Sequence, residues 1–122
     1  MMRINADAVF EMSQLAARVM LPRGNGKIIN LASMTSFVAG LDVAAYTASK
    51  GAVAQMTKAF SNEGAPRGIQ VNAVAPGYIM TKMNRDFFQD KEASWRIFRR
   101  IAAGRWGKPE DIAAGAGMYL QM

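Results

Sequence analysis

Apolar residues recur at three- and four-residue steps near the start of the chain, which predicts an amphipathic helix over residues 3–21. Pro22, Gly24 and Gly26 end this pattern. Residues 27–32 follow as a nearly continuous apolar run, which is typical of a strand buried on both faces. The chain is therefore expected to open with a helix and a buried strand. The apolar positions of the helix are Val9, Met12, Leu15, Ala16, Val19 and Met20.

The middle of the chain repeats this order of elements. A second helix is predicted from about Val43 to Gly64, where glycine and proline stop it. Residues 69–75 read as a second buried strand, which Pro76-Gly77 closes. The alternation of strands and helices is the βαβ pattern, which implies a parallel sheet with a right-handed crossover.

The last third is more polar. Residues 78–105 are mixed and charged, and one or two short helices are predicted there. Pro109 begins a last helix, because proline suits the first helical position and Glu110 and Asp111 suit the positive end of the helix dipole.

These elements predict an α/β fold with a partial, truncated Rossmann-type (doubly wound) parallel sheet and flanking helices. The 122 residues permit one modest domain. Two parallel strands with about three helices would leave sheet edges unpaired and apolar helix faces uncovered. We therefore expect the isolated chain to be marginally stable, to aggregate, or to pair with another chain.

Composition excludes several classes of function. The chain has no cysteine and no histidine, so we expect no disulfide, no metal site and no Ser-His-Asp triad. The net charge of +6 is spread among acidic residues, which favours a solvated basic surface over a nucleic-acid partner. No apolar stretch reaches the ~20 residues that span a bilayer, and no secretory segment precedes the first helix, so we expect a cytoplasmic protein without a membrane partner.

The pair Tyr46-x-x-x-Lys50 carries the candidate chemistry. Residues four apart share one face of a helix, so the phenol and the ammonium would point the same way. A free tyrosine loses its proton near pH ~10, but a nearby cation favours the phenolate. Such a pair can exchange a proton with a substrate oxygen at neutral pH.

Other polar residues surround this pair in the sequence. Ser33 follows the first strand, and Asn5 lies in the first helix. Each also has a structural explanation: Asn5 as a helix cap, Ser33 as a strand-end turn residue, and Pro76-Gly77 as an ordinary turn. Asn30 and Asn72, inside the predicted strands, are expected to be structural hydrogen-bonding groups.

Taken together, Asn5, Ser33, Tyr46 and Lys50 resemble the catalytic tetrad of the short-chain dehydrogenase/reductase family in order and spacing. The resemblance covers nearly the whole chain. Residues 101–111 are most similar to the branch of 2-deoxy-D-gluconate 3-dehydrogenases and gluconate 5-dehydrogenases, except that Ala102 replaces a proline.

The resemblance implies an oxidoreductase that transfers hydride between a nicotinamide and a carbonyl or alcohol of a small polyol or sugar acid. Tyr46 would donate and accept the proton, and Lys50 would assist it and bind the nicotinamide ribose. Ser33 would hold the substrate oxygen. Asn5 would shape the first helix so that a water chain reaches Lys50.

The implied cofactor is NAD or NADP, with the preference open. The residues implied to contact it are Tyr46, Lys50, Pro76, Gly77, Ile79 and Thr81.

Part of the family's pattern is absent. The glycine-rich turn that holds the pyrophosphate after the first strand is missing, since residues 24–26 precede a strand and residues 115–117 lie within the last predicted helix. We therefore expect residues 1–122 to be a partial catalytic region, corresponding to the middle and late portion of an enzyme about twice as long. The alternative is a non-catalytic remnant that only self-associates or pairs with a full-length relative.

The family also implies a partner and a substrate-binding segment. Its dimers form through the helices that correspond to residues 3–21 and 43–64, so a homo-oligomer is expected. Residues 78–105 correspond to the lid over the substrate, and their basic residues would suit a carboxylate, although a solvated surface explains them equally well. The basic residues are Lys82, Arg85, Lys91, Arg96, Arg99, Arg100 and Arg105; the acids are Asp86, Asp90 and Glu92.

Overall fold

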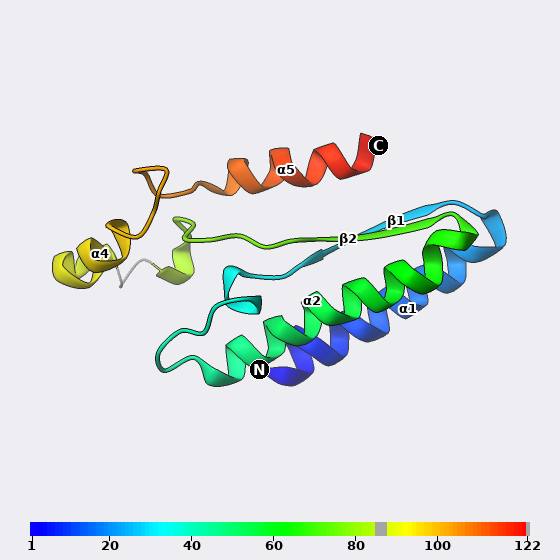
Figure 1. Cartoon of the computed structure of the whole chain (residues 1–122), viewed down its shortest axis with the longest axis horizontal. Coiled ribbons are helices and arrows are strands. Elements are labelled where there is room, and N and C mark those ends of the chain that lie inside the picture. The colour runs from blue at the N-terminus through cyan, green and yellow to red at the C-terminus, as the bar shows by residue number, and fades with distance from the viewer. Residues whose placement is uncertain (85–87, 122) are drawn as a thin grey trace.

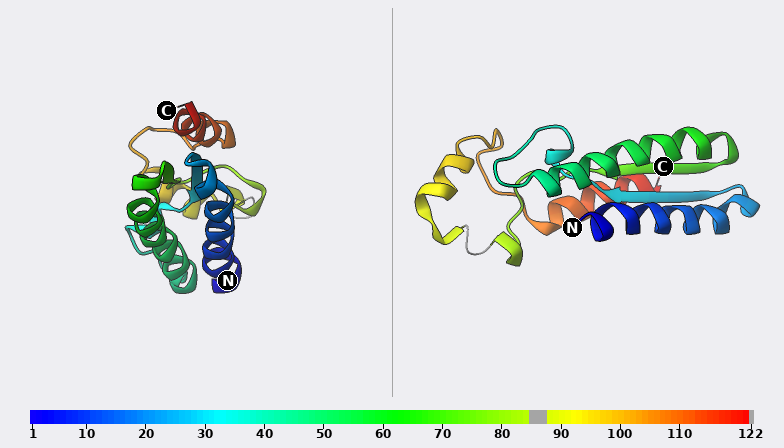
Figure 2. Two further views of the ribbon diagram at one scale, coloured as in Figure 1. Left: turned by 90° about the vertical axis from the view of Figure 1, so that its right-hand side faces the viewer. Right: turned by 90° about the horizontal axis from the view of Figure 1, so that it is seen from below.

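Two parallel strands form the centre of the molecule, and helices lie on both of their faces (Figures 1 and 2). The structure is a computed structural model that describes residues 1–84 and 88–121. Strand β1 (Gly26–Leu31) pairs with β2 (Ile69–Val74), with Ile28 opposite Val71. Helices α1 (Ala8–Met20) and α2 (Ala44–Gly64) cover one face, and α5 (Pro109–Gln121) lies along the other. The predicted α/β architecture with a parallel sheet is confirmed.

The boundaries of the elements agree with the sequence pattern to within a few residues. One difference is at the start, where Arg3–Asp7 forms a turn of π-helix before α1. Short 3-10 turns follow α1 (Leu21–Arg23) and α2 (Ala65–Arg67). The segment between β2 and α5 contains a 3-10 turn (Lys82–Asn84) and helix α4 (Lys91–Phe98), as predicted for this region.

The two turns that lead into the strands share the sequence Pro-Arg-Gly and end in the left-handed conformation. Gly24 has φ +62° and Gly68 has φ +80°, values that favour glycine. The two turns lie against each other, because the Gly26 N–H donates to the Gly68 carbonyl at 3.3 Å. A side chain at residue 68 would overlap the carbonyl oxygen of Gly24.

The core lies between the sheet and helices α1 and α2. Ile28, Ile69 and Val71 form its buried centre, and Phe60 of α2 packs against them. Val53, also in α2, is fully buried. A polar group completes this layer: Ser13 donates to the side chain of Asn30 at 3.3 Å, and Asn30 donates to Thr57 at 3.0 Å. The prediction that Asn30 is a structural hydrogen-bonding residue is therefore confirmed.

The opposite face of the sheet is less covered than the sequence suggested. In β1, Ile28 and Asn30 are buried, whereas Ile29 is half-buried and Leu31 is 56% exposed. The prediction of a strand buried on both faces is wrong for this end of β1, because α5 does not cover it.

The apolar stripe of α1 is likewise only partly buried. Met12, Leu15 and Val19 are each more than half exposed, since the contact with the sheet takes up only one side of the stripe. Within the described residues, no helix is both long and apolar enough to cross a membrane.

Candidate active site

The candidate site lies at the carboxyl ends of β1 and β2, next to the first turns of α2. In open parallel sheets this is the edge at which ligands bind. Ser33 follows β1 by two residues, and Pro76 follows β2 by two residues. The Met34 N–H donates to the Pro76 carbonyl at 2.9 Å, which fixes the two loops side by side.

Ser33 begins a single 3-10 turn, Met34–Ser36. Its hydroxyl oxygen accepts a hydrogen bond from the Thr35 N–H at 3.1 Å, and its own N–H donates to the Ser36 hydroxyl at 3.2 Å. Ser33 is thus a turn residue, as its position after a strand predicts. Within the described part of the chain, its hydroxyl hydrogen is donated to no residue, so it is free to donate to a ligand.

Ser36 joins this turn to helix α2 and was not recognised from the sequence. Its hydroxyl donates to the backbone carbonyl of Lys50 at 2.7 Å. The same oxygen therefore holds the turn that carries Ser33 and the helix that carries Tyr46. The spacing Ser33-x-x-Ser36 is that of a capping box and was the signal available in the sequence.

Tyr46 and Lys50 lie one turn apart in α2, and both are half-buried. The Lys50 ammonium lies 5.9 Å from the centre of the Tyr46 ring, so the predicted shared face is confirmed. The ammonium donates to the carbonyl of Leu31, the last residue of β1, at 2.6 Å. Burial lowers the pKa of Lys50 below its usual value.

Asn5 lies within the π-helical turn before α1, where the Ala8 N–H bonds to the carbonyl of Arg3. The side-chain amide of Asn5 donates to the Ser49 hydroxyl at 3.3 Å, and Ser49 donates to the carbonyl of Tyr46 at 2.7 Å. Asn5 therefore reaches the turn of α2 between Tyr46 and Lys50 and is not a helix cap. Turns of π-helix often occur at functional sites.

The remaining residues that the resemblance implies as cofactor contacts lie in two different places. Pro76 and Gly77 lie beside the Ser33 turn, and Gly77 is exposed. Ile79 instead forms a bridge with Gly107, and Thr81 lies exposed beyond it. Among residues 1–84 and 88–121, no hydrogen bond joins Ile79 or Thr81 to the Tyr46 end of α2.

Aromatic packing and ion pairs organise the segment between β2 and α5. Trp106 packs against Tyr78, Phe88 and Phe98, with ring centres 4.7–6.3 Å apart. Arg105 binds both carboxylate oxygens of Asp111, at 2.8 and 3.1 Å.

The basic residues of this segment therefore differ in availability. Arg105 forms an ion pair with Asp111, and Arg96 forms one with Glu92. Arg99 and Arg100 are exposed and, within the described part of the chain, form no ion pair. Arg85 and Asp86 lie outside the described residues.

The comparisons with known proteins agree with this geometry. The family described as short chain dehydrogenase matches residues 1–92. A 2-dehydro-3-deoxy-D-gluconate 5-dehydrogenase of Bacillus subtilis (strain 168) is 52% identical over 119 residues, which are 98% of this chain and 46% of that protein. A protein of the same name from Dickeya dadantii (strain 3937) is 47% identical over 120 residues, covering 98% and 47%.

A solved structure shows the same arrangement of elements. The gluconate 5-dehydrogenase from Burkholderia cenocepacia J2315, in complex with NADP and tartrate, superposes with a TM-score of 0.93 at 42% identity over 97% of this chain and 46% of that chain. This chain therefore spans a little under half the length of the relatives that it matches.

Proposed function

Because the chain belongs to the short chain dehydrogenase family, we propose that it is the proton-transfer portion of an NAD(P)-dependent oxidoreductase that interconverts an alcohol and a carbonyl of a small sugar acid. The observation that carries this proposal is the position of Tyr46 and Lys50 beside the turn of Ser33, to which Ser36 ties their helix. The three relatives described above are named as dehydrogenases of sugar acids, which supports the reaction class.

The residues of this chain would divide the work as follows. The Tyr46 hydroxyl gives its proton to the carbonyl oxygen during reduction and takes it back during oxidation. The Ser33 hydroxyl donates to the same oxygen and holds it in place. Lys50 stabilises the phenolate left on Tyr46, and Asn5 fixes that turn of α2 through Ser49.

The nicotinamide end of NAD or NADP fits this site, since Lys50 offers a donor and Gly77 leaves room beside the sheet edge. When bound, the cofactor supplies or accepts the hydride at the carbon. The pyrophosphate end does not fit, because Gly26 begins β1 and Gly115 lies inside α5, so neither belongs to a glycine-rich turn after a strand. Tight cofactor binding therefore needs polypeptide beyond these 122 residues.

The exposed basic residues of the lid segment support an acidic substrate. Arg105 is bound to Asp111, so Arg99 and Arg100 are the better candidates for a substrate carboxylate. Replacing both by alanine, in an active enzyme that contains this chain, should raise KM for a sugar acid and leave KM for a neutral polyol unchanged. An equal rise for both substrates would refute a role in binding the carboxylate.

Self-association through α1 is part of this proposal. Ile4 is 76% exposed and continues the exposed apolar stripe of Met12, Leu15 and Val19. The outward side of α2 carries smaller or polar residues, such as Ala48 and Gln55. We expect Leu15→Glu to shift sedimentation toward monomer; sedimentation independent of concentration in the unmodified chain would contradict this.

The catalytic role is tested by replacing the matched region of the Bacillus subtilis relative with this chain. The chimera should oxidise or reduce its sugar acid, and Tyr46→Phe should lower kcat by about 100-fold or more. Lys50→Met should do likewise, whereas Lys58→Met, an exposed lysine two turns further along α2, should have no effect. Retained activity in Tyr46→Phe would refute the proposal.

Cofactor binding distinguishes the non-catalytic alternative from the proposed oxidoreductase. Titration of NADPH fluorescence should show saturable binding for the chimera and weak or no binding for the isolated chain. A folded chimera that binds NADPH but turns over no substrate would favour the alternative.

A further inference from the structure

Two serines outside the candidate tetrad connect its members in pairs. The Ser36 hydroxyl accepts from the N–H of Ser33 at 3.2 Å and donates to the carbonyl of Lys50 at 2.7 Å. A hydroxyl offers one donor and two acceptor positions, so it can form both bonds at once. One oxygen atom therefore connects the backbone of two candidate catalytic residues.

Ser49 makes a similar link within the same stretch of α2. Its hydroxyl accepts from the Asn5 side chain at 3.3 Å and donates to the carbonyl of Tyr46 at 2.7 Å. Ser49 is fully buried, and Ser36 is half-buried. Each serine thus accepts from one candidate catalytic residue and donates to the backbone of another.

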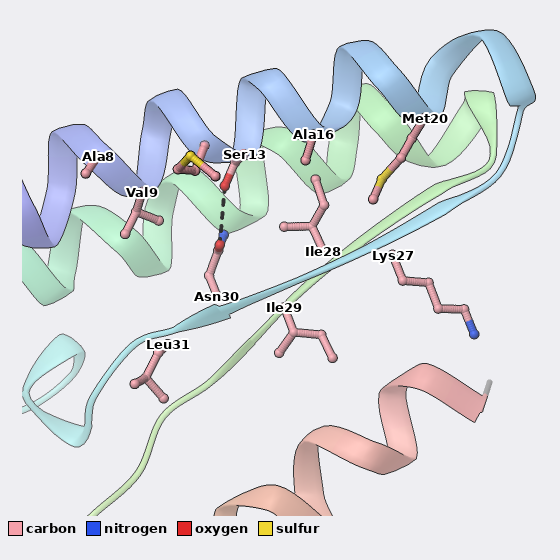
Figure 3. Close-up of a pocket in the computed structure, with 11 residues that line it drawn as sticks. Ala8, Val9, Ser13, Ala16, Met20, Lys27, Ile28, Ile29, Asn30 and Leu31 are labelled. Atoms are coloured by element: carbon pink, nitrogen blue, oxygen red, sulfur yellow. Dashed lines mark hydrogen bonds between the residues drawn. The ribbon is translucent and has the colours of Figure 1, made fainter.

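The strand before Ser33 is fixed without the help of Ser36. Asn30, near the end of β1, accepts a hydrogen bond from Ser13 of α1, as Figure 3 shows, and donates to Thr57 of α2. Thr57 lies about two helical turns beyond Lys50, so this bond does not reach the part of α2 that carries the candidate site. The position of the turn after β1 relative to Tyr46 and Lys50 therefore depends on contacts of its own.

The chain between this turn and α2 does not supply such contacts. Residues 37–42 are exposed throughout, with Phe37 at 70% and Leu41 at 93%. Among the described residues, hydrogen bonds hold this stretch only at its start, where the N–H groups of Phe37 and Val38 donate to the Met34 carbonyl. Over the same residues, the bond from Ser36 is the only hydrogen bond between the turn Met34–Ser36 and α2.

We propose that Ser36 is a positioning residue of this site, which sets the separation between the Ser33 hydroxyl and the Tyr46 hydroxyl by holding the backbone of Ser33 to that of Lys50. This inference rests on the proposed function, in which both hydroxyls meet at one substrate oxygen. Each must then lie within hydrogen-bond reach of that oxygen, about 2.6–3.2 Å. A displacement of ~1 Å can cost about 100-fold in rate, so the link through Ser36 matters although Ser36 touches no reacting atom.

The side chain of Lys50 does not replace this link. Its ammonium donates to the carbonyl of Leu31 at 2.6 Å, but the proposed function needs the same ammonium to stabilise the phenolate of Tyr46. A lysine ammonium sits on a flexible four-carbon stem and can change partners. The Ser36 hydroxyl has no second task, so its bond holds α2 to the turn while Lys50 acts.

The test uses the chimera with the Bacillus subtilis relative, with kcat counted per bound NADPH so that unfolded molecules do not contribute. Ser36→Ala should lower kcat about tenfold or more and leave Kd for NADPH within about twofold. Thr35→Val is the matched control, because the Thr35 hydroxyl is buried in the same turn and bonds to no described residue. It should change kcat less than about twofold. An unchanged kcat in Ser36→Ala, or an equal loss in Thr35→Val, would overturn the proposal.

Pairs of substitutions separate positioning from stability. Ser33→Ala removes the hydroxyl that Ser36 positions but keeps the N–H that bonds to Ser36. In that background Ser36→Ala should lower kcat less than about threefold, whereas in an Asn5→Ala background it should show its full effect. A full effect in both backgrounds would show that Ser36 only stabilises the fold. Ser36→Thr keeps the hydroxyl and should retain most of kcat; a loss as large as in Ser36→Ala would overturn the assignment to the hydroxyl.

Amide hydrogen exchange tests the link without measuring activity. In Ser36→Ala the Ser33 amide loses its acceptor and should exchange faster, whereas the Met34 amide, which donates to Pro76, should stay protected. Unchanged exchange at Ser33 would refute the link. Retained activity in Tyr46→Phe would defeat the proposed function, whereas loss of activity in Tyr46→Phe with full activity in Ser36→Ala would defeat this inference alone.

Discussion

The buried group of Ser13, Asn30 and Thr57 should contribute a large share of the stability of this small core. All three are at most 8% exposed, and they link α1, β1 and α2. Asn30→Ala removes both hydrogen bonds. Thr57 keeps its bond to the Val53 carbonyl at 2.8 Å, but the buried Ser13 hydroxyl loses its acceptor.

The expected loss is about 3 kcal/mol. Two buried hydrogen bonds contribute roughly 1 kcal/mol each, and a buried hydroxyl without an acceptor costs about 1 kcal/mol or more. With a urea dependence of ~1.5 kcal/mol per molar, the unfolding midpoint should fall by about 2 M, as followed by circular dichroism.

Two comparisons make this prediction refutable. Asn72→Ala, on the neighbouring strand and outside the buried group, should cost no more than about 0.5 kcal/mol. Ser13→Ala should be destabilising alone but neutral or stabilising in the Asn30→Ala background, because it removes the hydroxyl left without an acceptor. Additive effects of the two substitutions would show that the hydrogen bond between Ser13 and Asn30 is not the cause.

Three further predictions concern pH and the turns. Hydrogen bonds from Arg105, and then from the backbone N–H of Lys108, lower the pKa of Asp111 from 3.8 to about 2. The contribution of these bonds to the free energy of unfolding is therefore complete above pH 3.8 and should be lost as the pH falls toward 2. Urea unfolding of Asp111→Asn should lack this acid-sensitive part, and an unchanged acid profile would refute it. Burial lowers the pKa of Lys50, so the unfolded chain binds more protons than the folded chain as the pH approaches 10.5. The free energy of unfolding should therefore rise with pH in this range, and the rise should be smaller in Lys50→Met. An equal rise in the unmodified chain and the variant would contradict this effect of burial. Gly68→Ala should lower the melting temperature more than Gly24→Ala. Both residues have positive φ, but only at residue 68 would the added methyl group overlap a backbone atom, the carbonyl oxygen of Gly24. An equal fall in melting temperature for the two variants would exclude the close contact of the two turns.

The order and type of the elements followed from local patterns in the sequence. The apolar runs at residues 27–32 and 69–75 identified both strands, and the glycines and prolines after α1 and α2 marked where these helices end. The shared face of Tyr46 and Lys50 also followed, since helical geometry sets the direction of residues four apart. These features depend on neighbours within a few positions, so the sequence alone carries them.

Several contacts of the candidate site were beyond local reasoning. Ser36 bonds to Lys50 across 14 positions, and Lys50 reaches Leu31 across 19. The engagement of Arg105 by Asp111 and the π-helical turn around Asn5 likewise appear only in three dimensions. Each depends on which groups the fold brings together, and side chains of one type have many alternative partners in a linear pattern.

The degree of burial separates the two kinds of information most clearly. The apolar run of β1 and the stripe of α1 both read as buried surfaces, but Leu31 of the run and Met12, Leu15 and Val19 of the stripe are exposed. A sequence records that a side chain is apolar, which determines that it favours contact with other apolar groups. Only the tertiary structure decided which of these faces the chain covers by itself, because the number of strands and helices available, and not the hydrophobicity of one segment, limits how much surface can be buried.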